Sequence, residues 1–180
     1  MTEPGFELVA SRVLGRGIFL ELEEQRLMSS AGVEVVRDIV HHPGGVAVLP
    51  IDGDRVWLIR QHRAALSRAL EEIPAGKLDP GDEDIEAAAR RELAEELGAE
   101  AEHLSHLATM APSPGYTDEV IEIFLAEGLE FGHRNPDGEE ERSATVFALP
   151  IAVALDSIDR GEVIDAKTQV ALLQWKRRQA

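Results

Sequence analysis

The sequence of 180 residues predicts an α/β fold in which strands surround a glutamate-rich helix and further helices close the chain. Three observations lead to this prediction. Apolar, β-favouring runs recur, as at 46–51 and 119–126. A four-residue apolar period within 85–97 is typical of a helix that packs through one face. Two more helical patterns follow, at 151–160 and 165–179.

The N-terminal part contains three β-favouring stretches, at 7–13, 17–27 and 32–41, with turn signals between them. They predict a small antiparallel sheet. Its apolar surface is too small for an independent domain, so we expect it to pack on another surface, and a second subunit is the expected partner. We therefore divide the chain into N-terminal antiparallel strands with a dimerisation role, residues 1–42, and a main domain, residues 43–180.

The main domain is expected to begin with a strand, a turn and a returning strand. Residues 46–51 form the buried strand, Asp52-Gly53-Asp54 the hairpin turn, and 55–60 the second strand. After the glutamate-rich helix, further strands are expected at 104–110, 119–126 and 144–149. The last helix, 165–179, has Val170, Leu173 and Trp175 as its expected apolar face.

Composition excludes several classes of protein. The chain has 34 acidic and 18 basic residues, a net charge of −16, which argues against general binding to nucleic acid or to an anionic membrane. It has no cysteine, so disulfides and thiolate metal sites are excluded. No apolar run approaches the ~20 residues that span a bilayer, and the N-terminus does not resemble a signal peptide. We expect a cytoplasmic protein.

Residues 76–99 are the most informative for function. Glu92, Glu95 and Glu96 are spaced i, i+3 and i+4, which places all three on one face of an α-helix. Like charges so placed repel one another unless a cation lies among them. Carboxylate oxygens suit Mg²⁺ or Mn²⁺, and Mg²⁺ binds readily through carboxylates, phosphate oxygens and water. The alternative is a plain solvated helix face, which is the commoner meaning of a glutamate-rich pattern.

The residues around these glutamates favour a functional site over a solvated helix face. Arg91 precedes Glu95 by four positions and can hold its carboxylate in place. Gly98 is a helix stop, and either Asp82 or Asp84 is a helix start. An apolar stripe at four-residue spacing anchors the helix beside the acids. It consists of Ile85, Ala89, Leu93 and Leu97.

From Glu83 the chain reads Glu83-x7-Arg91-Glu92-Leu93-x-Glu95-Glu96-x-Gly98, with the small Ala99 next. This segment resembles the signature box of the Nudix hydrolases, G-x5-E-x7-R-E-U-x-E-E-x-G-U, in which U is a bulky apolar residue. Six residues rather than five separate Gly76 from Glu83, which we interpret as a one-residue insertion in the loop. The resemblance implies a Nudix-type α/β/α sandwich with a mixed sheet, plus the small N-terminal antiparallel sheet.

Other segments resemble the ADP-ribose pyrophosphatases of this family. Pro114 follows Ala99 by fifteen places, within an S-P-G-x-[TS]-x-E setting at 113–119, and the segments 61–63 and 71–76 are also similar. The resemblance implies a homodimeric enzyme that hydrolyses the diphosphate bond of ADP-ribose to AMP and ribose 5-phosphate. Two alternatives stay open. One is a hydrolase of another nucleoside diphosphate derivative, either a nucleotide sugar or a dinucleotide, and the other is a non-catalytic nucleotide-sensing module.

The resemblance also implies a metal site. Glu92, Glu95 and Glu96 would hold Mg²⁺ (or Mn²⁺), with the backbone carbonyl of Ala75 as a further ligand. Such ions would cancel the charge of a bridged diphosphate, orient its phosphorus and lower the pKa of a bound water. Glu95 is therefore also counted as a catalytic residue.

A general base is expected from the acidic loop 137–141, because this family often takes its base from a late acidic loop. Residues two apart in extended chain point the same way. We therefore assign the base to Glu139 and a metal-facing role to Glu141. Glu140 is a rival for the base, and a solvated loop without function is the alternative.

Substrate contacts are expected from five residues. Arg60 and Arg63 suit a diphosphate or a terminal ribose, because guanidinium groups fork onto phosphate oxygens. Glu72 could accept a hydrogen bond from a sugar hydroxyl. Gly115 and Tyr116 belong to the Pro/Gly loop, where Tyr116 would face a base or a ribose. Exposed charges at strand ends and ordinary packing are the alternatives.

Overall fold

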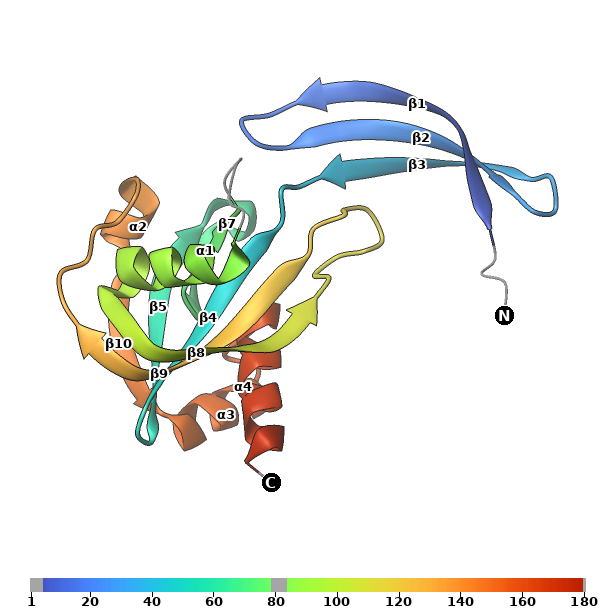
Figure 1. Cartoon of the computed structure of the whole chain (residues 1–180). Coiled ribbons are helices and arrows are strands. Elements are labelled where there is room, and N and C mark those ends of the chain that lie inside the picture. Colours follow the sequence, from blue (N-terminus) through green and yellow to red (C-terminus); the bar gives the residue numbers. More distant parts are fainter. Residues whose placement is uncertain (1–4, 79–83, 180) are drawn as a thin grey trace. The chain divides into compact units, whose positions relative to one another are not determined.

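The structure is a computed structural model that describes residues 5–78 and 84–179 (Figure 1). Within these residues the chain separates into two compact units. The first contains the residues up to Gly44 together with Ala111–Val120, and the second contains Gly45–Met110 and the residues from Ile121 onward. The division of function between residues 1–42 and 43–180 stays a prediction.

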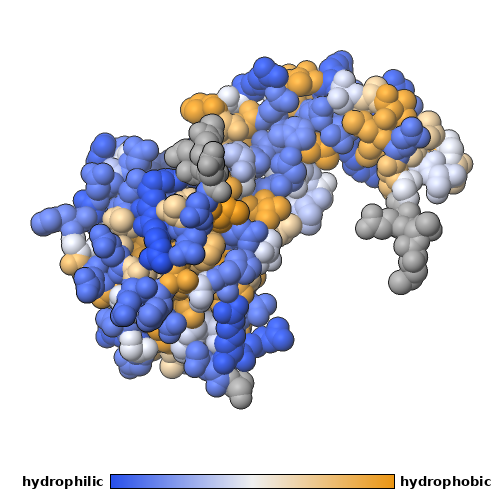
Figure 2. All heavy atoms as spheres, viewed as in Figure 1, coloured by the Kyte–Doolittle hydropathy of each residue, from blue (hydrophilic) through white to orange (hydrophobic). Residues whose placement is uncertain are grey.

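The first unit is built on an antiparallel three-stranded sheet, as the sequence predicts. Its strands are β1 (Phe6–Arg16), β2 (Glu21–Ser29) and β3 (Glu34–His41), in the order β1-β2-β3. Gly32 has a φ of 77°, which allows the tight turn between β2 and β3. Figure 2 shows hydrophobic residues gathered on this sheet, and many of their side chains are exposed. They include Phe6, Leu8, Val9, Val13, Leu14, Val33 and Val36.

The second unit contains a seven-stranded mixed sheet. Its order is β10-β5-β4-β9-β8, with β6 beside β5 and β7 beside β4. β4 and β9 are parallel, and the other pairs are antiparallel. The strands are β4 (Gly45–Asp52), β5 (Arg55–Arg63), β6 (Arg68–Glu72), β7 (Ala75–Lys77), β8 (Ala99–Met110), β9 (Ile121–Phe131) and β10 (Thr145–Pro150).

Helices cover both faces of this sheet (Figure 1). Along β4, Val46 and Val48 pack with α1 and the segment that follows it, whereas Ala47 and Leu49 pack in the core formed with α3 and α4. This alternation buries β4 on both sides, so the α/β/α sandwich is confirmed. The helical segments are η1 (Ala64–Leu66), α1 (Ile85–Glu92), the π-helical segment η2 (Leu93–Leu97), α2 (Glu139–Ser143), α3 (Ile151–Asp159) and α4 (Ala166–Arg178).

Some details of the predicted packing are wrong. In the apolar stripe of the glutamate-rich helix, Ile85 is 40% exposed, although the other three members are buried. On the last helix Leu173 is 45% exposed, whereas Val170 and Trp175 pack partly buried against the core. The buried residues of α4 are Lys167, Thr168, Ala171 and Leu172. Two of these are polar, and a pattern based on apolar residues alone therefore misplaces the buried face.

Among the described residues, none of the helices has both the length and the apolar character that crossing a membrane requires.

Candidate functional site

The glutamate-rich helix has a defined start and end. Asp84 is the N-cap, since its side chain accepts a hydrogen bond from the Glu86 N–H at 3.0 Å. The other candidate start, Asp82, lies outside the described residues, as does Glu83. Gly98 ends the helix with a φ of 69°, a left-handed conformation that favours glycine. The predicted Gly98 stop is therefore confirmed.

The final turn of this helix is a π-helix rather than an α-helix. Glu92 ends α1, and Glu95 and Glu96 lie within η2, Leu93–Leu97. Glu92 and Glu96 are 4% and 2% exposed, whereas the Glu95 side chain is 23% exposed. The prediction that all three glutamates share one helix face assumed regular α-helical spacing. The wider π-helical turn changes the directions in which Glu95 and Glu96 point. Single π-turns of this kind occur frequently at functional sites.

Each glutamate has a fixed partner. Arg91 Nη1 donates to Glu92 Oε1 at 2.8 Å and to Glu95 Oε2 at 3.1 Å, which confirms the predicted contact between Arg91 and Glu95. The Ala75 backbone N–H donates to Glu96 Oε2 at 2.7 Å. The three carboxylates are therefore held by an arginine of their own helix and by the backbone of β7.

β7 packs directly against the helix at Gly76. A Cβ atom at this position would overlap the carboxyl group of Glu92. A Cβ at Gly45, which pairs with β7 in the sheet, would lie 2.9 Å from the Gly76 carbonyl oxygen. A side chain at either position would therefore force the strand or the carboxylate to shift, so this close approach favours glycine.

Burial makes these carboxylates unusually weak acids. It raises the pKa of Glu92 to about 7, and the charges of Glu95 and Glu141 act in the same direction, against the opposing effect of Arg91. It raises the pKa of Glu96 to about 8, helped by Glu92 and Glu141 and opposed by the hydrogen bond from Ala75. The negative charges of this cluster are therefore unfavourable without a counter-cation.

The donor set fits a hard divalent cation. Carboxylate oxygens are the ligands that Mg²⁺ and Mn²⁺ prefer, and a cation here would compensate for the burial and the mutual repulsion that raise both pKa values. In the described part of the chain, no three acidic, histidine or cysteine side chains are grouped closely enough to hold a metal as they stand. Glu92 and Glu96 instead accept hydrogen bonds from Arg91 and Ala75.

We expect the metal-free protein to lose stability as the pH rises from about 5.5 to about 8. The folded pKa values of Glu92 and Glu96 lie above the ordinary 4.5. The folded state therefore holds protons that unfolding releases, and the free energy of unfolding falls with rising pH by about a few kcal/mol. Thermal unfolding in EDTA and in Mg²⁺ measures this effect. The stabilisation by Mg²⁺ should be larger at pH 8 than at pH 5.5.

The melting temperatures in EDTA must be subtracted from those in Mg²⁺, because His41 also makes the free energy of unfolding fall as the pH rises. The hydrogen bonds that His41 donates to Asp118 and Glu23 raise its pKa, so its contribution to stability is also lost as the pH rises. His41 does not belong to the glutamate cluster, and the Mg²⁺-dependent part isolates the carboxylates. A Mg²⁺ stabilisation that is equal at both pH values would contradict the expectation.

A cleft of about 330 Å³ lies beside Glu96. Its walls include Arg63 and Ala75, which the sequence predicted as site residues, and Gln61 and Lys77, which it did not. Gln61 is only 5% exposed. Its place in the strand pattern is that of a buried residue, so no signal in the sequence indicates that it lines a cleft. The acidic segment 137–141 forms the remaining wall.

The acidic segment is helical, so the predicted extended approach to a strand is wrong. Glu139 and Glu141 belong to α2, where residues two apart do not share a direction. The Glu139 side chain is 89% exposed and lies 3.7 Å from Arg142. Glu141 is half-buried, accepts a hydrogen bond from the Asp137 N–H at 2.7 Å, and raises the pKa of the buried glutamates.

Sequence reasoning also missed the residue that holds α2. The Nη2 atom of Arg134 donates to the Glu141 carbonyl at 2.9 Å, and its Nη1 donates to the Ala144 carbonyl at 3.2 Å. Both acceptors lie at the C-terminal end of α2, where backbone carbonyls lack helical partners. Arg134 sits in a loop without a motif, so no pattern could have identified it.

The predicted substrate residues of β5 and β6 are engaged in ion pairs. Arg63 donates from Nε and Nη2 to the two oxygens of Glu72, at 2.7 and 2.6 Å, and Lys167 also pairs with Glu72. Glu72 is 1% exposed, so a sugar hydroxyl would have to compete with these cations. Arg60 is exposed, pairs with Glu71, and lies 5.9 Å over the ring of Phe147.

Gly115 and Tyr116 belong to the first unit. Val40 of β3 donates its N–H to the Tyr116 carbonyl at 2.7 Å, and His41 Nδ1 lies 2.6 Å from Asp118. The loop is therefore fixed to β3, and the Tyr116 side chain is 54% exposed. Substrate binding by this loop stays a prediction.

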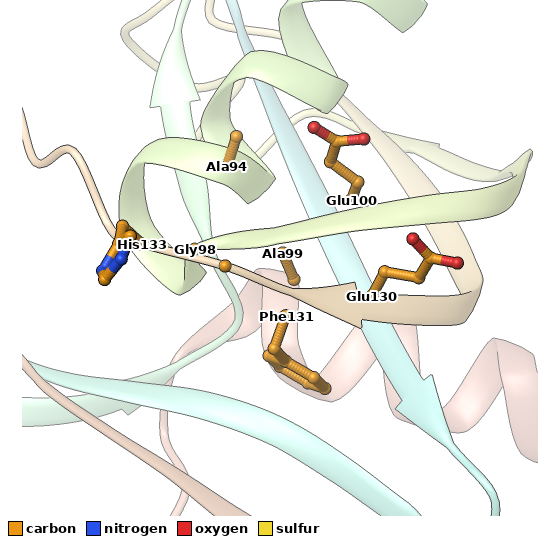
Figure 3. Close-up of a pocket in the computed structure, with 8 residues that line it drawn as sticks. Ala94, Gly98, Ala99, Glu100, Glu130, Phe131 and His133 are labelled. Atoms are coloured by element: carbon orange, nitrogen blue, oxygen red, sulfur yellow. The ribbon is translucent and has the colours of Figure 1, made fainter.

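A second hollow, of about 280 Å³, lies where η2 ends and β8 begins (Figure 3). Its carboxylates, Glu100 and Glu130, stand on adjacent strands and are exposed to solvent. It lacks the buried acids of the first cleft. Beside this hollow, the Gly132 N–H donates a hydrogen bond of 2.7 Å to the Gly98 carbonyl. This bond connects the end of the helix to the residue that follows β9.

The fold and the glutamate box define a class of protein. A family model described as the NUDIX domain matches residues 41–168, and the chain belongs to this family. Among its relatives, the ADP-ribose pyrophosphatase of Bacillus subtilis (strain 168) is 38% identical over 88% of this chain and 84% of the relative. The methanol dehydrogenase activator of Bacillus methanolicus is 36% identical over the same shares.

A solved structure described as an ADP compounds hydrolase has the same fold. It matches with a TM-score of 0.83 and 24% identity, over 96% of this chain and 93% of that one. The predicted family and fold are therefore confirmed.

Proposed function

We propose that this protein hydrolyses the diphosphate bond of ADP-ribose in a metal-dependent reaction and releases AMP and ribose 5-phosphate. The observation that carries the proposal is the pair of buried glutamates, Glu92 and Glu96, packed against Ala75 and Gly76 beside an open cleft. The choice of ADP-ribose is supported by the 38% identical relative that bears this activity in its name.

Glu92, Glu95 and Glu96 would hold Mg²⁺ (or Mn²⁺) together with the Ala75 carbonyl. The cation supplies charge neutralisation for the diphosphate and a lowered pKa for the attacking water. Burial of Glu92 and Glu96 supports this assignment, because desolvated carboxylates gain most from a cation. Arg91 would keep Glu95 in place before the cation binds.

Proton removal from the water is proposed for the acidic helix α2. Glu139 is the proposed base and Glu141 the residue that faces the cation, and both line the cleft. Glu139→Gln should lower kcat about 10²-fold without changing the affinity for Mg²⁺, whereas Glu141→Gln should weaken Mg²⁺ binding. Glu140→Gln tests the rival base, and we expect it to change kcat less than Glu139→Gln does. If Glu139→Gln leaves kcat unchanged and Glu141→Gln abolishes turnover, the base is Glu141.

Arg60 and Arg63 are the proposed contacts of the diphosphate and the terminal ribose, with Glu72 behind Arg63. Gly115 and Tyr116 are proposed to contact the nucleoside. We also propose a homodimer, because the three-stranded sheet exposes more apolar side chains than a free surface favours. Light scattering tests this, and a monomer at micromolar concentration would contradict it. The cytoplasmic location stays a prediction.

The deciding experiment is product analysis with purified protein and Mg²⁺. ADP-ribose, GDP-mannose, UDP-glucose and NADH are supplied separately, with and without EDTA. We expect AMP from ADP-ribose at the highest kcat/KM and no product in EDTA. If another substrate is cleaved faster, the assignment as a diphosphate hydrolase stands and the assignment of ADP-ribose is wrong. If none of the four is cleaved, a nucleotide-sensing module is favoured.

A further inference from the structure

A largely buried cluster of four charges lies beside the cleft, and the proposed function gives a role to only two of them, Arg63 and Glu72. The cluster consists of Arg63, Glu72, Asp165 and Lys167. Glu72 is 1% exposed and Lys167 is 8% exposed. Lys167 Nζ donates to Glu72 Oε2, which Arg63 Nη2 also contacts, and to Asp165 Oδ1 at 2.9 Å. Two cations thus face two carboxylates.

The first turn of α4 fixes the position of Lys167. Asp165 is the N-cap of α4 and accepts hydrogen bonds from Thr168, from its N–H at 2.9 Å and from its Oγ1 at 2.6 Å. Thr168 Oγ1 in turn accepts the Ile73 N–H at 2.9 Å. Ile73 lies two residues before Ala75, so the helix start is tied to the chain that leads into the glutamate site.

Glu72 is ionised although it is buried. Burial raises the pKa of its carboxyl, but the hydrogen bonds and charges of Arg63 and Lys167 outweigh this effect and lower the net pKa. A buried carboxylate left with a single cation attracts it more strongly than one shared between two cations. We therefore expect removal of Lys167 to draw Arg63 more tightly onto Glu72.

Arg63 is the member of the cluster that reaches the cleft. Its side chain is 37% exposed, compared with 9% for Lys167, and it lines the cleft with Ala75 and Glu96. We propose that Lys167 is a positioning residue, which shares the charge of Glu72 from behind, so that Arg63, although it donates from Nε and Nη2 to Glu72, can still offer N–H groups to the diphosphate of the substrate. The identity of that anion rests on the proposed function.

The test compares Lys167→Met, which keeps most of the length of the side chain and removes its charge, with Lys167→Arg, which keeps the charge. The readouts are KM and kcat for ADP-ribose and the Kd of inorganic pyrophosphate measured by calorimetry in Ca²⁺. We expect Lys167→Met to raise KM and Kd at least about tenfold, with kcat changed less than about threefold. Lys167→Arg should restore both constants. Should Lys167→Met fail to fold, Lys167→Gln replaces it.

A double-mutant cycle shows whether Lys167 acts through Arg63. In an Arg63→Ala background, Lys167→Met should have no further effect on KM or Kd. An equal effect in both backgrounds would overturn the proposal. Val170→Ala is the matched control on the same helix, because it removes packing from the core without touching the charges. It should lower the melting temperature and leave KM unchanged.

The two readouts separate this inference from the proposed function. If the protein does not cleave ADP-ribose, but Lys167→Met weakens pyrophosphate binding, the substrate assignment fails and the positioning role stands. If ADP-ribose is cleaved and Lys167→Met changes neither constant, the positioning role fails alone. A wild-type protein that does not bind pyrophosphate also overturns the positioning role.

Discussion

Glu96→Gln is expected to abolish Mg²⁺-dependent hydrolysis and, at the same time, to stabilise the metal-free protein at pH 8. Loss of one carboxylate from the cation site should lower kcat about 10³-fold, equivalent to about 4 kcal/mol of transition-state stabilisation. The stability gain arises because Gln keeps the hydrogen bond from Ala75 and removes a charge whose pKa burial raises to about 8. The gain should be on the order of 1–3 kcal/mol. Product assays and thermal unfolding in EDTA measure the two effects.

Glu86→Gln is the matched control for this variant. Glu86 lies on α1, is exposed, and pairs with Arg90 at 2.9 Å on the outer side of the helix. Its substitution should leave kcat unchanged and cost about 0.3 kcal/mol of stability. If Glu96→Gln retains wild-type turnover, or if its melting temperature in EDTA at pH 8 falls, the cation-site assignment of Glu96 is wrong.

Gly76→Ala is expected to have the second largest effect. The added Cβ would overlap the carboxyl group of Glu92, so either β7 or the carboxylate must move. We expect a loss of about 1–3 kcal/mol in the free energy of unfolding, which is typical of overpacking. Because the displaced group is a proposed metal ligand, kcat should also fall about 10²-fold, equivalent to about 3 kcal/mol. Urea denaturation and kinetics at saturating Mg²⁺ measure the two losses.

Gly132→Ala controls for the change from glycine to alanine. A Cβ at Gly132 would make only an ordinary contact, 3.9 Å from the Gly98 carbonyl oxygen, and its φ is not in the left-handed region. Its activity should match that of the wild type. A Gly76→Ala protein with normal activity at higher Mg²⁺ would mean that the carboxylate of Glu92 is displaced only in the metal-free state.

The sequence predicted the parts of the fold that depend on local pattern. The buried strand at 46–51, the hairpin at Gly53 and the helix that ends at Gly98 are all present. Each follows from apolar period or turn chemistry, which act over a few residues. The glutamate box was identifiable for the same reason, because its members are close together in the chain.

The sequence could not predict features that depend on distant partners. β7 has three residues and exists because it pairs with β4, and η2 departs from the regular helix that the spacing assumed. The acidic segment folds into α2, whose end is held by Arg134. Lys167 looks like an ordinary residue in a helix until Glu72 is placed beside it by the fold.

The pairing of β4 with β9 governs when this site can form during synthesis. These strands are parallel, from Gly45 opposite Ile121 to Pro50 opposite Ala126, and the glutamate box lies between them in the chain. Long-range parallel pairing is slow, because a large loop must close before its contacts form. A ribosome-bound chain that ends before Ile121 therefore carries all three box glutamates and lacks β9, on which their helix packs. Protease protection of such stalled chains should appear only once β9 has emerged.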